Sequence, residues 1–217
     1  MLDLNIIQKI AVWALPVLFA ITVHEVAHGW VALKLGDKTA LMLGRLTLNP
    51  LKHIDMVGTV IVPLVLLTFG GFIFGWAKPV PINPQNFKHK KRDMALVSIA
   101  GPLANFIMAI IWAGITKLGL ILLNNGMSAA LPVVLMGQAG ISINLVLMVL
   151  NLIPIPPLDG SHIIAAILPG RWVYYYDRIA PYGFFILLFL LITGMLSFIL
   201  WPPIMALQRL IATLLGL

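Results

Sequence analysis

Cysteine is absent from this chain of 217 residues, and glutamate occurs once, as Glu25. The lack of cysteine excludes disulfides, thiolate metal ligands and cysteine nucleophiles. Charged residues make up only 10% of the chain and hydrophobic residues 61%, a balance that excludes a soluble globular domain. The composition instead indicates a polytopic membrane protein, in which any metal must be held by histidine, aspartate, glutamate or backbone oxygen.

Apolar segments recur along the chain, and most approach the roughly 20 residues that a helix needs to cross a bilayer. We therefore expect an all-α polytopic membrane protein with five to six apolar helical segments, and one domain over residues 1–217. The segments lie at roughly residues 6–35, 56–76, 94–123, 132–153, 180–200 and 203–217.

The second segment, 56–76, is flanked by basic residues on both sides and is interrupted by Pro63 and by Gly70-Gly71. A full crossing would put one basic flank outside, against the positive-inside bias. A re-entrant hairpin bent at Gly70-Gly71 keeps both flanks in the cytoplasm, so we favour it over an ordinary span. The pattern leaves both interpretations open.

The net charge of +7 comes mainly from basic residues in short loops beside apolar spans. That placement indicates membrane orientation and contact with the lipid bilayer, and it gives no reason to expect nucleic acid. The loop 124–128 has no basic residue and is expected outside, whereas Arg171 and Arg178 place the next loop inside. The N-terminus then lies outside a cell membrane, and the first segment ends in the cytoplasm.

Residues 39–48 are rich in strand-forming residues around Gly44 and end at Asn49-Pro50. We expect a short β-hairpin here, directly after the first helix. A plain loop fits the pattern nearly as well.

The single glutamate lies in the sequence His24-Glu25-Val26-Ala27-His28, inside the first apolar segment. An ionisable residue at mid-bilayer costs roughly 2.5–3.5 kcal/mol, so it needs a partner or a function. Residues four apart project from one helix face, so both imidazoles can bind one zinc ion while the carboxylate acts on a water. We predict a metal site; a polar cluster with another role is the alternative.

A hydrolytic zinc site takes a third protein ligand and leaves one position to water. Asp159 follows the sequence Asn151-Leu-Ile-Pro-Ile-Pro-Pro-Leu, in which prolines break the helix between apolar residues. Irregular backbone at membrane depth is tolerated where it lines a cavity or contacts protein, so we predict Asp159 as the third ligand, with His162 as its competitor. The remaining acids and two histidines lie in loops, mostly beside cations, and are expected to be solvated: Asp3, Asp37, Asp55, Asp93, Asp177, His53 and His89.

These motifs together resemble those of the site-2 protease family of intramembrane zinc metalloproteases, in particular its short bacterial branch. The resemblance covers roughly residues 10–170, which would form the core of one transmembrane metalloprotease domain. It rests on His-Glu-Val-Ala-His at 24–28, the Asn-x-x-Pro-x-x-x-Leu-Asp-Gly pattern at 151–160, Ala-Gly-Pro-Leu-Ala-Asn at 100–105, Gly-Arg-Leu-Thr-Leu-Asn-Pro at 44–50 and Gly-Trp-Ala-Lys-Pro-Val-Pro at 75–81.

The resemblance implies that His24, His28 and Asp159 bind one zinc ion and that Glu25 is the general base. It implies a substrate-binding role for Asn151 and close helix packing at Gly101 and Asn105, for which a purely structural role is the alternative. No peptide-binding domain is inserted between the third and fourth segments, so selection of substrate by an attached domain is in doubt.

We therefore expect an enzyme that hydrolyses peptide bonds of a membrane-protein substrate. Two other classes remain open, a membrane metal transporter and a catalytically inert protein that binds membrane helices. A transporter does not need Glu25 beside the metal and usually shows internal repeats, which the sequence lacks. An inert binder has no need of a base at Glu25. The sequence leaves the oligomeric state unknown.

Overall fold

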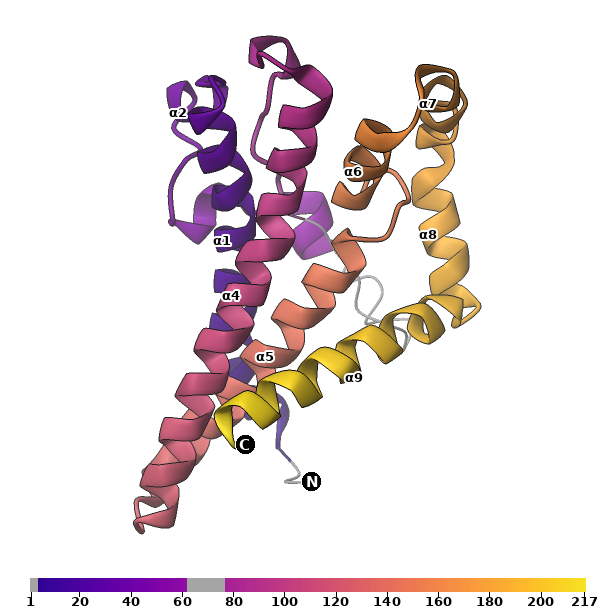
Figure 1. The fold of residues 1–217 in the computed structure, drawn as a ribbon. Coiled ribbons are helices and arrows are strands. Elements are labelled where there is room, and N and C mark those ends of the chain that lie inside the picture. Colours follow the sequence, from indigo (N-terminus) through magenta and orange to yellow (C-terminus); the bar gives the residue numbers. More distant parts are fainter. Residues whose placement is uncertain (1–3, 62–76) are drawn as a thin grey trace.

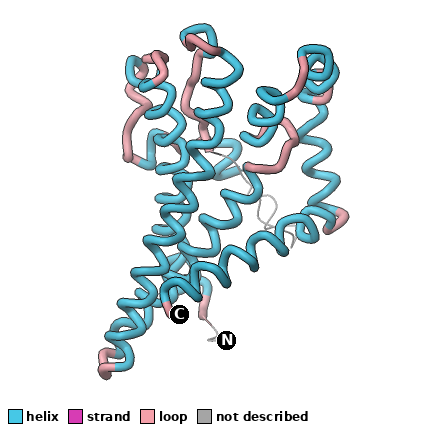
Figure 2. The backbone as a smooth tube through the Cα atoms, in the orientation of Figure 1, coloured by secondary structure: helices cyan, strands magenta, loops and turns pink. Residues whose placement is uncertain are grey.

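The protein was studied as a computed structural model that describes residues 4–61 and 77–217. Within these residues the chain forms helices and loops and no strand (Figures 1 and 2). The helices are α1 (Ile6–Lys34), α2 (Thr39–Met42), α4 (Lys90–Asn124), α5 (Leu131–Asn151), α6 (Asp159–Ile167), α7 (Gly170–Asp177), α8 (Gly183–Ile192) and α9 (Met195–Leu215), with short 3-10 or π turns at Pro50–Lys52, Met56–Ile61, Pro84–Asn86, Ser128–Ala130 and Ala180–Tyr182.

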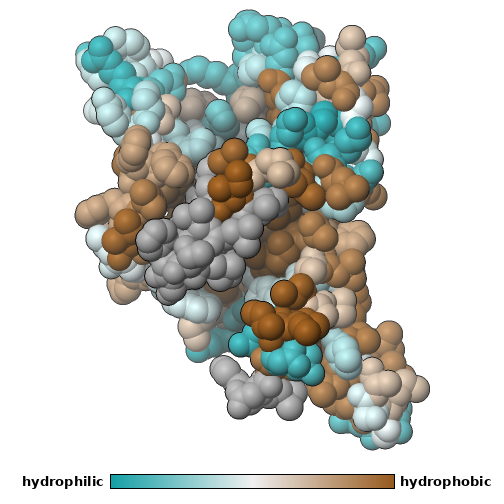
Figure 3. All heavy atoms as spheres, turned by 180° about the vertical axis from the view of Figure 1, so that it is seen from behind, coloured by the Kyte–Doolittle hydropathy of each residue, from teal (hydrophilic) through white to brown (hydrophobic). Residues whose placement is uncertain are grey.

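Helices α1, α4 and α5 pack against one another and form the inner bundle (Figure 1). Helix α9 crosses α5 obliquely, and the described ends of the chain lie at the end of the bundle opposite to α2 and α7. Seen from behind, hydrophobic residues occupy the middle of the molecule and hydrophilic ones gather toward the end that carries α2 and α7 (Figure 3). Among the described residues, five helical stretches are long and apolar enough to cross a membrane, so the chain is a multi-pass membrane protein.

Helix α1 is bounded by signals that are readable in the sequence. Its first turn carries a capping box, in which Gln8 N donates to Asn5 Oδ1 at 2.9 Å and Asn5 N donates to Gln8 Oε1 at 3.0 Å. It ends where Gly36 adopts a φ of +108°, with backbone bonds from Gly36 to Leu33 and from Asp37 to Ala32. The predicted extent of the first segment is therefore confirmed.

The β-hairpin expected over residues 39–48 is wrong. Residues 39–42 form α2, and the helix ends at Gly44, which has a φ of +63°. Gly44 N bonds Leu41 O and Arg45 N bonds Ala40 O, the pairing that closes a helix at a left-handed glycine. Asp37 accepts hydrogen bonds from the Thr39 amide and hydroxyl just before this helix, so the local hydrogen bonds at both of its ends differ from those of a strand pair.

The boundary between the last two apolar segments also differs from the prediction. The chain breaks at Gly194, which has a φ of +75°, and not at Pro202-Pro203, which lie inside α9. A proline within a transmembrane helix is tolerated where local adjustments satisfy the freed carbonyl, so glycine is the stronger helix terminator here.

The two basic flanks of the segment 56–76 meet. Lys78 N donates to His53 O at 2.9 Å, so the chain enters and leaves this segment at one place. Residues 62–76, which include the predicted bend at Gly70-Gly71, lie outside the described residues.

Asp37 is buried and organises the loops at the end of α1. Its carboxylate accepts bonds from Asn83 N and Asn86 Nδ2, both at 2.7 Å, and from the amide and hydroxyl of Thr39. Burial alone would raise the pKa of Asp37, but these hydrogen bonds outweigh it and the pKa lies below its ordinary value. The expectation of a solvated loop charge at Asp37 is therefore wrong.

Glycines let α4 and α5 approach closely. A Cβ added at Gly140 would lie 2.3 Å from the Trp112 ring, and one added at Gly137 would lie 2.2 Å from Thr116 Oγ1. Small residues serve this purpose in membrane bundles, where close van der Waals packing replaces the hydrophobic effect.

We predict that Gly140→Ala lowers the free energy of unfolding by about 1–3 kcal/mol, because the added methyl group must displace the indole of Trp112. Denaturant titration in detergent micelles would measure the loss. Gly114→Ala is the matched control, since a Cβ at Gly114 meets no atom within 4 Å. Equal stabilities of the two variants would contradict the close packing.

We also predict that the stability difference between the wild type and Asp37→Asn depends on pH. A carboxyl whose pKa is lowered on folding stabilises the protein above its unfolded pKa of about 3.9, and that contribution is lost as the pH falls through the folded value. The difference should be largest near neutral pH and should close below about pH 4. Melting temperatures measured between pH 3 and 7 test this, and a constant difference would contradict it.

Candidate metal centre

The two histidines of the HExxH sequence project from one face of α1 into the bundle. Both are buried, and their rings lie edge to face with centroids 4.6 Å apart. Their Nε2 atoms are 3.0 Å apart. The helical spacing predicted from the sequence thus brings both nitrogens to one point.

Each imidazole is oriented through its other nitrogen. His24 Nδ1 donates to Asn105 Oδ1 at 2.5 Å, and His28 Nδ1 donates to Val97 O at 2.7 Å. Because both acceptors are carbonyl oxygens, the Nδ1 atoms carry the protons and the Nε2 lone pairs face inward. This is the second-shell arrangement that prepares histidine for a metal.

Asn105 is itself held in place. Its amide donates to Asn144 Oδ1 at 2.9 Å and to Ala20 O at 3.2 Å, and Asn144 donates to Gly140 O at 2.8 Å. A buried chain of amides therefore connects His24 to α5. Asn105 was predicted to serve helix packing, and Asn144 was not predicted to have a role. The signal for Asn144 is a lone asparagine inside an apolar segment.

Gly101 provides the space for the histidine pair. A Cβ at this position would lie 2.4 Å from His28 Nε2 and 2.6 Å from His24 Cε1. The packing role predicted for Gly101 is thus directed at the site, because any side chain would occupy the point where the two nitrogens converge.

Asp159 reaches the same point from the start of α6. The chain turns back after α5, and a Cβ at Gly160 would lie 2.4 Å from Leu152 O and 2.5 Å from Ile153 O, so only glycine fits this close return. Asp159 Oδ2 lies 3.3 Å from both histidine Nε2 atoms. The meeting of Asp159 with the histidines, expected from the sequence, is found in the structure.

The three atoms match the spacing of a zinc ligand set. Ligands about 2.0–2.1 Å from a tetrahedral zinc stand about 3.3 Å from one another. The structure has separations of 3.0, 3.3 and 3.3 Å, and the buried Asp159 Oδ2 accepts no hydrogen bond. Three lone pairs that converge in an apolar interior fit a cation, and two imidazoles with a carboxylate are ligands that suit zinc.

His24, His28 and Asp159 form the one group of three or more potential side-chain ligands among the described residues. His162, the predicted competitor of Asp159, is not part of it. Asn151 ends α5, and its amide donates to Leu147 O at 2.9 Å within its own helix, so a substrate role for it stays a prediction. His53 and Asp93, expected to be solvated, are instead buried. The His53 Nε2 atom lies within hydrogen-bond distance of Thr47 O, and Asp93 forms an ion pair with Arg92.

Glu25 faces a different partner. Its Oε2 atom accepts a hydrogen bond of 2.7 Å from Val80 N, in the loop that precedes α4. The carboxylate is next to a candidate ligand in sequence and is not part of the three-atom group. It is therefore not a candidate metal ligand in this arrangement.

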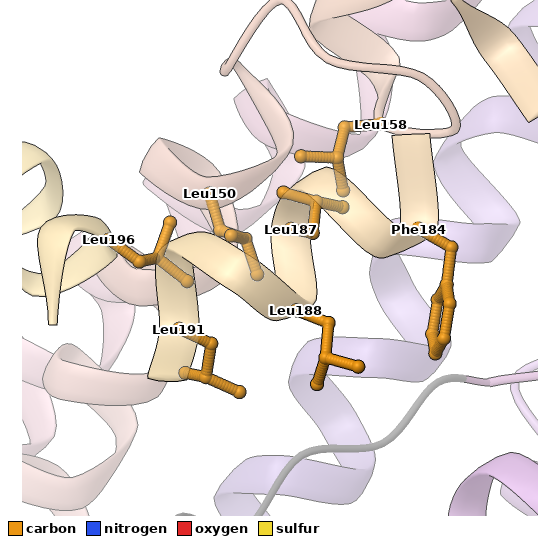
Figure 4. Close-up of a pocket in the computed structure, with 7 residues that line it drawn as sticks. All are labelled: Leu150, Leu158, Phe184, Leu187, Leu188, Leu191 and Leu196. Atoms are coloured by element: carbon orange, nitrogen blue, oxygen red, sulfur yellow. The ribbon is translucent and has the colours of Figure 1, made fainter. Parts of the chain in front are cut away.

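An apolar pocket of about 30 Å³ lies beside the Asp159 loop (Figure 4). None of the three candidate ligands lines it, and its volume suits about one water molecule. It is therefore a packing gap near the site and not the site itself. Its walls are Leu150, Leu158, Phe184, Leu187, Leu188, Leu191 and Leu196.

The chain is similar to known proteins and matches one family model. The family model described as peptidase family M50 matches residues 12–118 and 115–193. A Bacillus subtilis protein named "Putative zinc metalloprotease YwhC" is 38% identical over 88% of this chain and 85% of its own length. Two Rip2 proteins with the same description, from Mycolicibacterium smegmatis and Mycobacterium tuberculosis H37Rv, are 31% and 30% identical over 83% and 86% of the chain.

The chain spans 66% of the length of each of these two Rip2 proteins, so they carry additional sequence. No solved structure matches the chain. The family match covers both the histidine pair and Asp159. On this match and the relative at 38% identity, the chain belongs to peptidase family M50, the site-2 protease family.

Proposed function

We propose that this protein is an intramembrane zinc metalloprotease that hydrolyses peptide bonds of membrane-spanning substrates. His24, His28 and Asp159 hold one zinc ion in this proposal, and Glu25 is the general base. Residues 1–217 form a single transmembrane metalloprotease domain, with its core at roughly 10–170. The family match and the zinc metalloprotease names of the relatives support the chemistry.

One observation carries the proposal. Three buried lone pairs converge within 3.3 Å, and the single glutamate of the chain follows His24 directly in the sequence. A structural metal site is closed by protein ligands, whereas three protein ligands leave a position for water or substrate. A carboxylate beside such a position is what hydrolysis requires.

When bound, zinc supplies Lewis acidity that activates water and polarises a carbonyl. Glu25 accepts the proton that the attacking water loses as its oxygen adds to the scissile carbonyl carbon. It then gives this proton to the leaving nitrogen as the C–N bond breaks, so one water is consumed and a carboxyl and an amine are formed. Asn105 and the Val97 carbonyl keep the two imidazoles in the tautomer with inward Nε2 lone pairs.

Asp159 begins α6, which lies in the half of the bundle that carries α2 and its basic flanking residues (Figure 1), and the positive-inside bias assigns this end to the cytoplasm. We therefore propose cleavage in the cytoplasmic leaflet of a cell membrane. Asn151, at the end of α5 and eight positions before Asp159, is our candidate for binding the substrate backbone.

We predict about one zinc per purified wild-type chain. Asp159→Asn should lose the metal, because an amide is a weaker ligand than a carboxylate, whereas Glu25→Gln should keep it. Metal content after chelator-free purification, measured by mass spectrometry, tests this. Zinc retained in Asp159→Asn would overturn the ligand set, with His162→Ala as the next variant to examine.

We further predict that the wild type cleaves model transmembrane peptides in phosphatidylethanolamine and phosphatidylglycerol vesicles, and that Glu25→Gln does not. The expected loss is at least about 100-fold, as for removal of a general base. Mass spectrometry of the peptides identifies the cut site. Cleavage that survives Glu25→Gln would refute the assigned base.

The same vesicles separate the rival functions. Zinc entry into vesicles that contain the wild type would indicate a transporter. Peptides that bind and are never cut, by a zinc-loaded wild type, would indicate an inert binder.

A further inference from the structure

The loop that contacts Glu25 has an unusual sequence, Ala77-Lys78-Pro79-Val80-Pro81-Ile82-Asn83, followed by Pro84. We call residues 77–83 the strap. Lys78, Val80 and Asn83 each precede a proline, which biases them to extended backbone. Prolines have no N–H, so Val80 is the one residue between Lys78 and Ile82 that can donate a backbone hydrogen bond.

The Val80 N–H donates its hydrogen bond to Glu25. Val80 N lies 2.7 Å from Glu25 Oε2, a length typical of a hydrogen bond to a charged carboxylate. The Val80 side chain is 5% exposed and packs over Gly29 of α1, where an added Cβ would lie 3.0 Å from Val80 Cγ1. The strap thus crosses α1 at Gly29, one helical turn from Glu25.

Hydrogen bonds hold the strap in place on both sides of Val80. Arg45 Nη2 donates to Lys78 O at 2.9 Å and to Pro79 O at 3.3 Å. Asn83 N donates to Asp37 Oδ2 at 2.7 Å. Neither Arg45 nor Asp37 belongs to the candidate metal centre, yet both fix the backbone that holds the carboxylate.

We infer that the strap positions the Glu25 carboxylate for catalysis, and that Arg45 is a positioning residue that acts through it. This inference rests on the proposed function. A glutamate side chain has three rotatable torsions, and a base must be held near its proton to be efficient. The Val80 amide binds Oε2, fixes the rotation of the carboxylate and leaves Oε1 to take the proton.

The first test compares Arg45→Ala with the wild type on the model peptides. The kcat should fall about 10- to 100-fold, the loss expected from a catalytic group displaced by about 1 Å, while KM and zinc content stay unchanged. Arg45→Lys should recover part of the loss, because an ammonium group can still donate to a carbonyl. Arg171→Ala, the same change at an exposed arginine of α7, is the matched control and should keep wild-type kcat.

The second test removes the amide itself. Val80→Pro deletes the N–H and should lower kcat as Arg45→Ala does, whereas Val80→Ala keeps the N–H and should lower kcat much less than Val80→Pro. An equal loss in both variants would mean that the strap acts through side-chain packing, and the inference would fail. A rise in KM at constant kcat would also overturn it and assign the strap to substrate binding.

The contact can be followed without catalysis. In protein labelled with ¹⁵N-valine, the Val80 amide signal is identified by its loss in Val80→Ala. It should shift in both Glu25→Gln and Arg45→Ala, and it should not shift in Arg171→Ala. An unshifted signal would refute the strap contact.

The outcomes keep the two proposals apart. A zinc-loaded wild type that cleaves no peptide would refute the proposed function even where the Val80 amide responds to Glu25→Gln. An active wild type whose kcat is unchanged in Arg45→Ala would refute the strap inference and leave the protease function intact.

Discussion

The convergence of three lone pairs in an apolar interior is the constraint on which the described architecture depends. Two imidazole nitrogens and a carboxylate oxygen lie within 3.3 Å of one another, and such atoms repel unless a cation lies between them. Each helix of the bundle contributes to this arrangement. Helix α1 supplies the nitrogens, α4 orients them through Asn105 and Val97, and the turn after α5 returns Asp159 to them.

Close approach of backbones makes that convergence reachable. Glycine occurs wherever the site would otherwise be filled, at Gly101 beneath the histidines and at Gly160 against the carbonyls of the α5 terminus. In a bilayer the hydrophobic effect does not press helices together, so such contact depends on small residues and buried hydrogen bonds. The Asn105–Asn144 pair joins α4 and α5 at the level of His24 and so links packing to ligand geometry.

The meeting of His24, His28 and Asp159 was predictable from the sequence, because isolated polar residues in apolar segments are costly and therefore informative. His24, Glu25, His28 and Asp159 all carried that signal. The tertiary partners were not predictable. Asp37 lies beside Lys38 in the sequence, which predicts a solvated charge. In the structure its carboxylate accepts hydrogen bonds from residues 39, 83 and 86. The prediction of a hairpin at residues 39–48 was wrong because the chain forms a short helix that ends at Gly44, despite its strand-forming residues. Gly36, Gly44 and Gly194 follow helix ends and adopt a positive φ, so glycine was the sequence signal for these three boundaries.

The hydrogen bond between Lys78 N and His53 O joins the strap to the residue that follows the Pro50–Lys52 turn. The strap is also bonded to Arg45 and to Asp37, so three separate parts of the chain hold the backbone that binds Glu25. Arg45, Asp37 and His53 are thus connected to the Glu25 carboxylate through the strap, although none of them belongs to the three-atom group of candidate ligands.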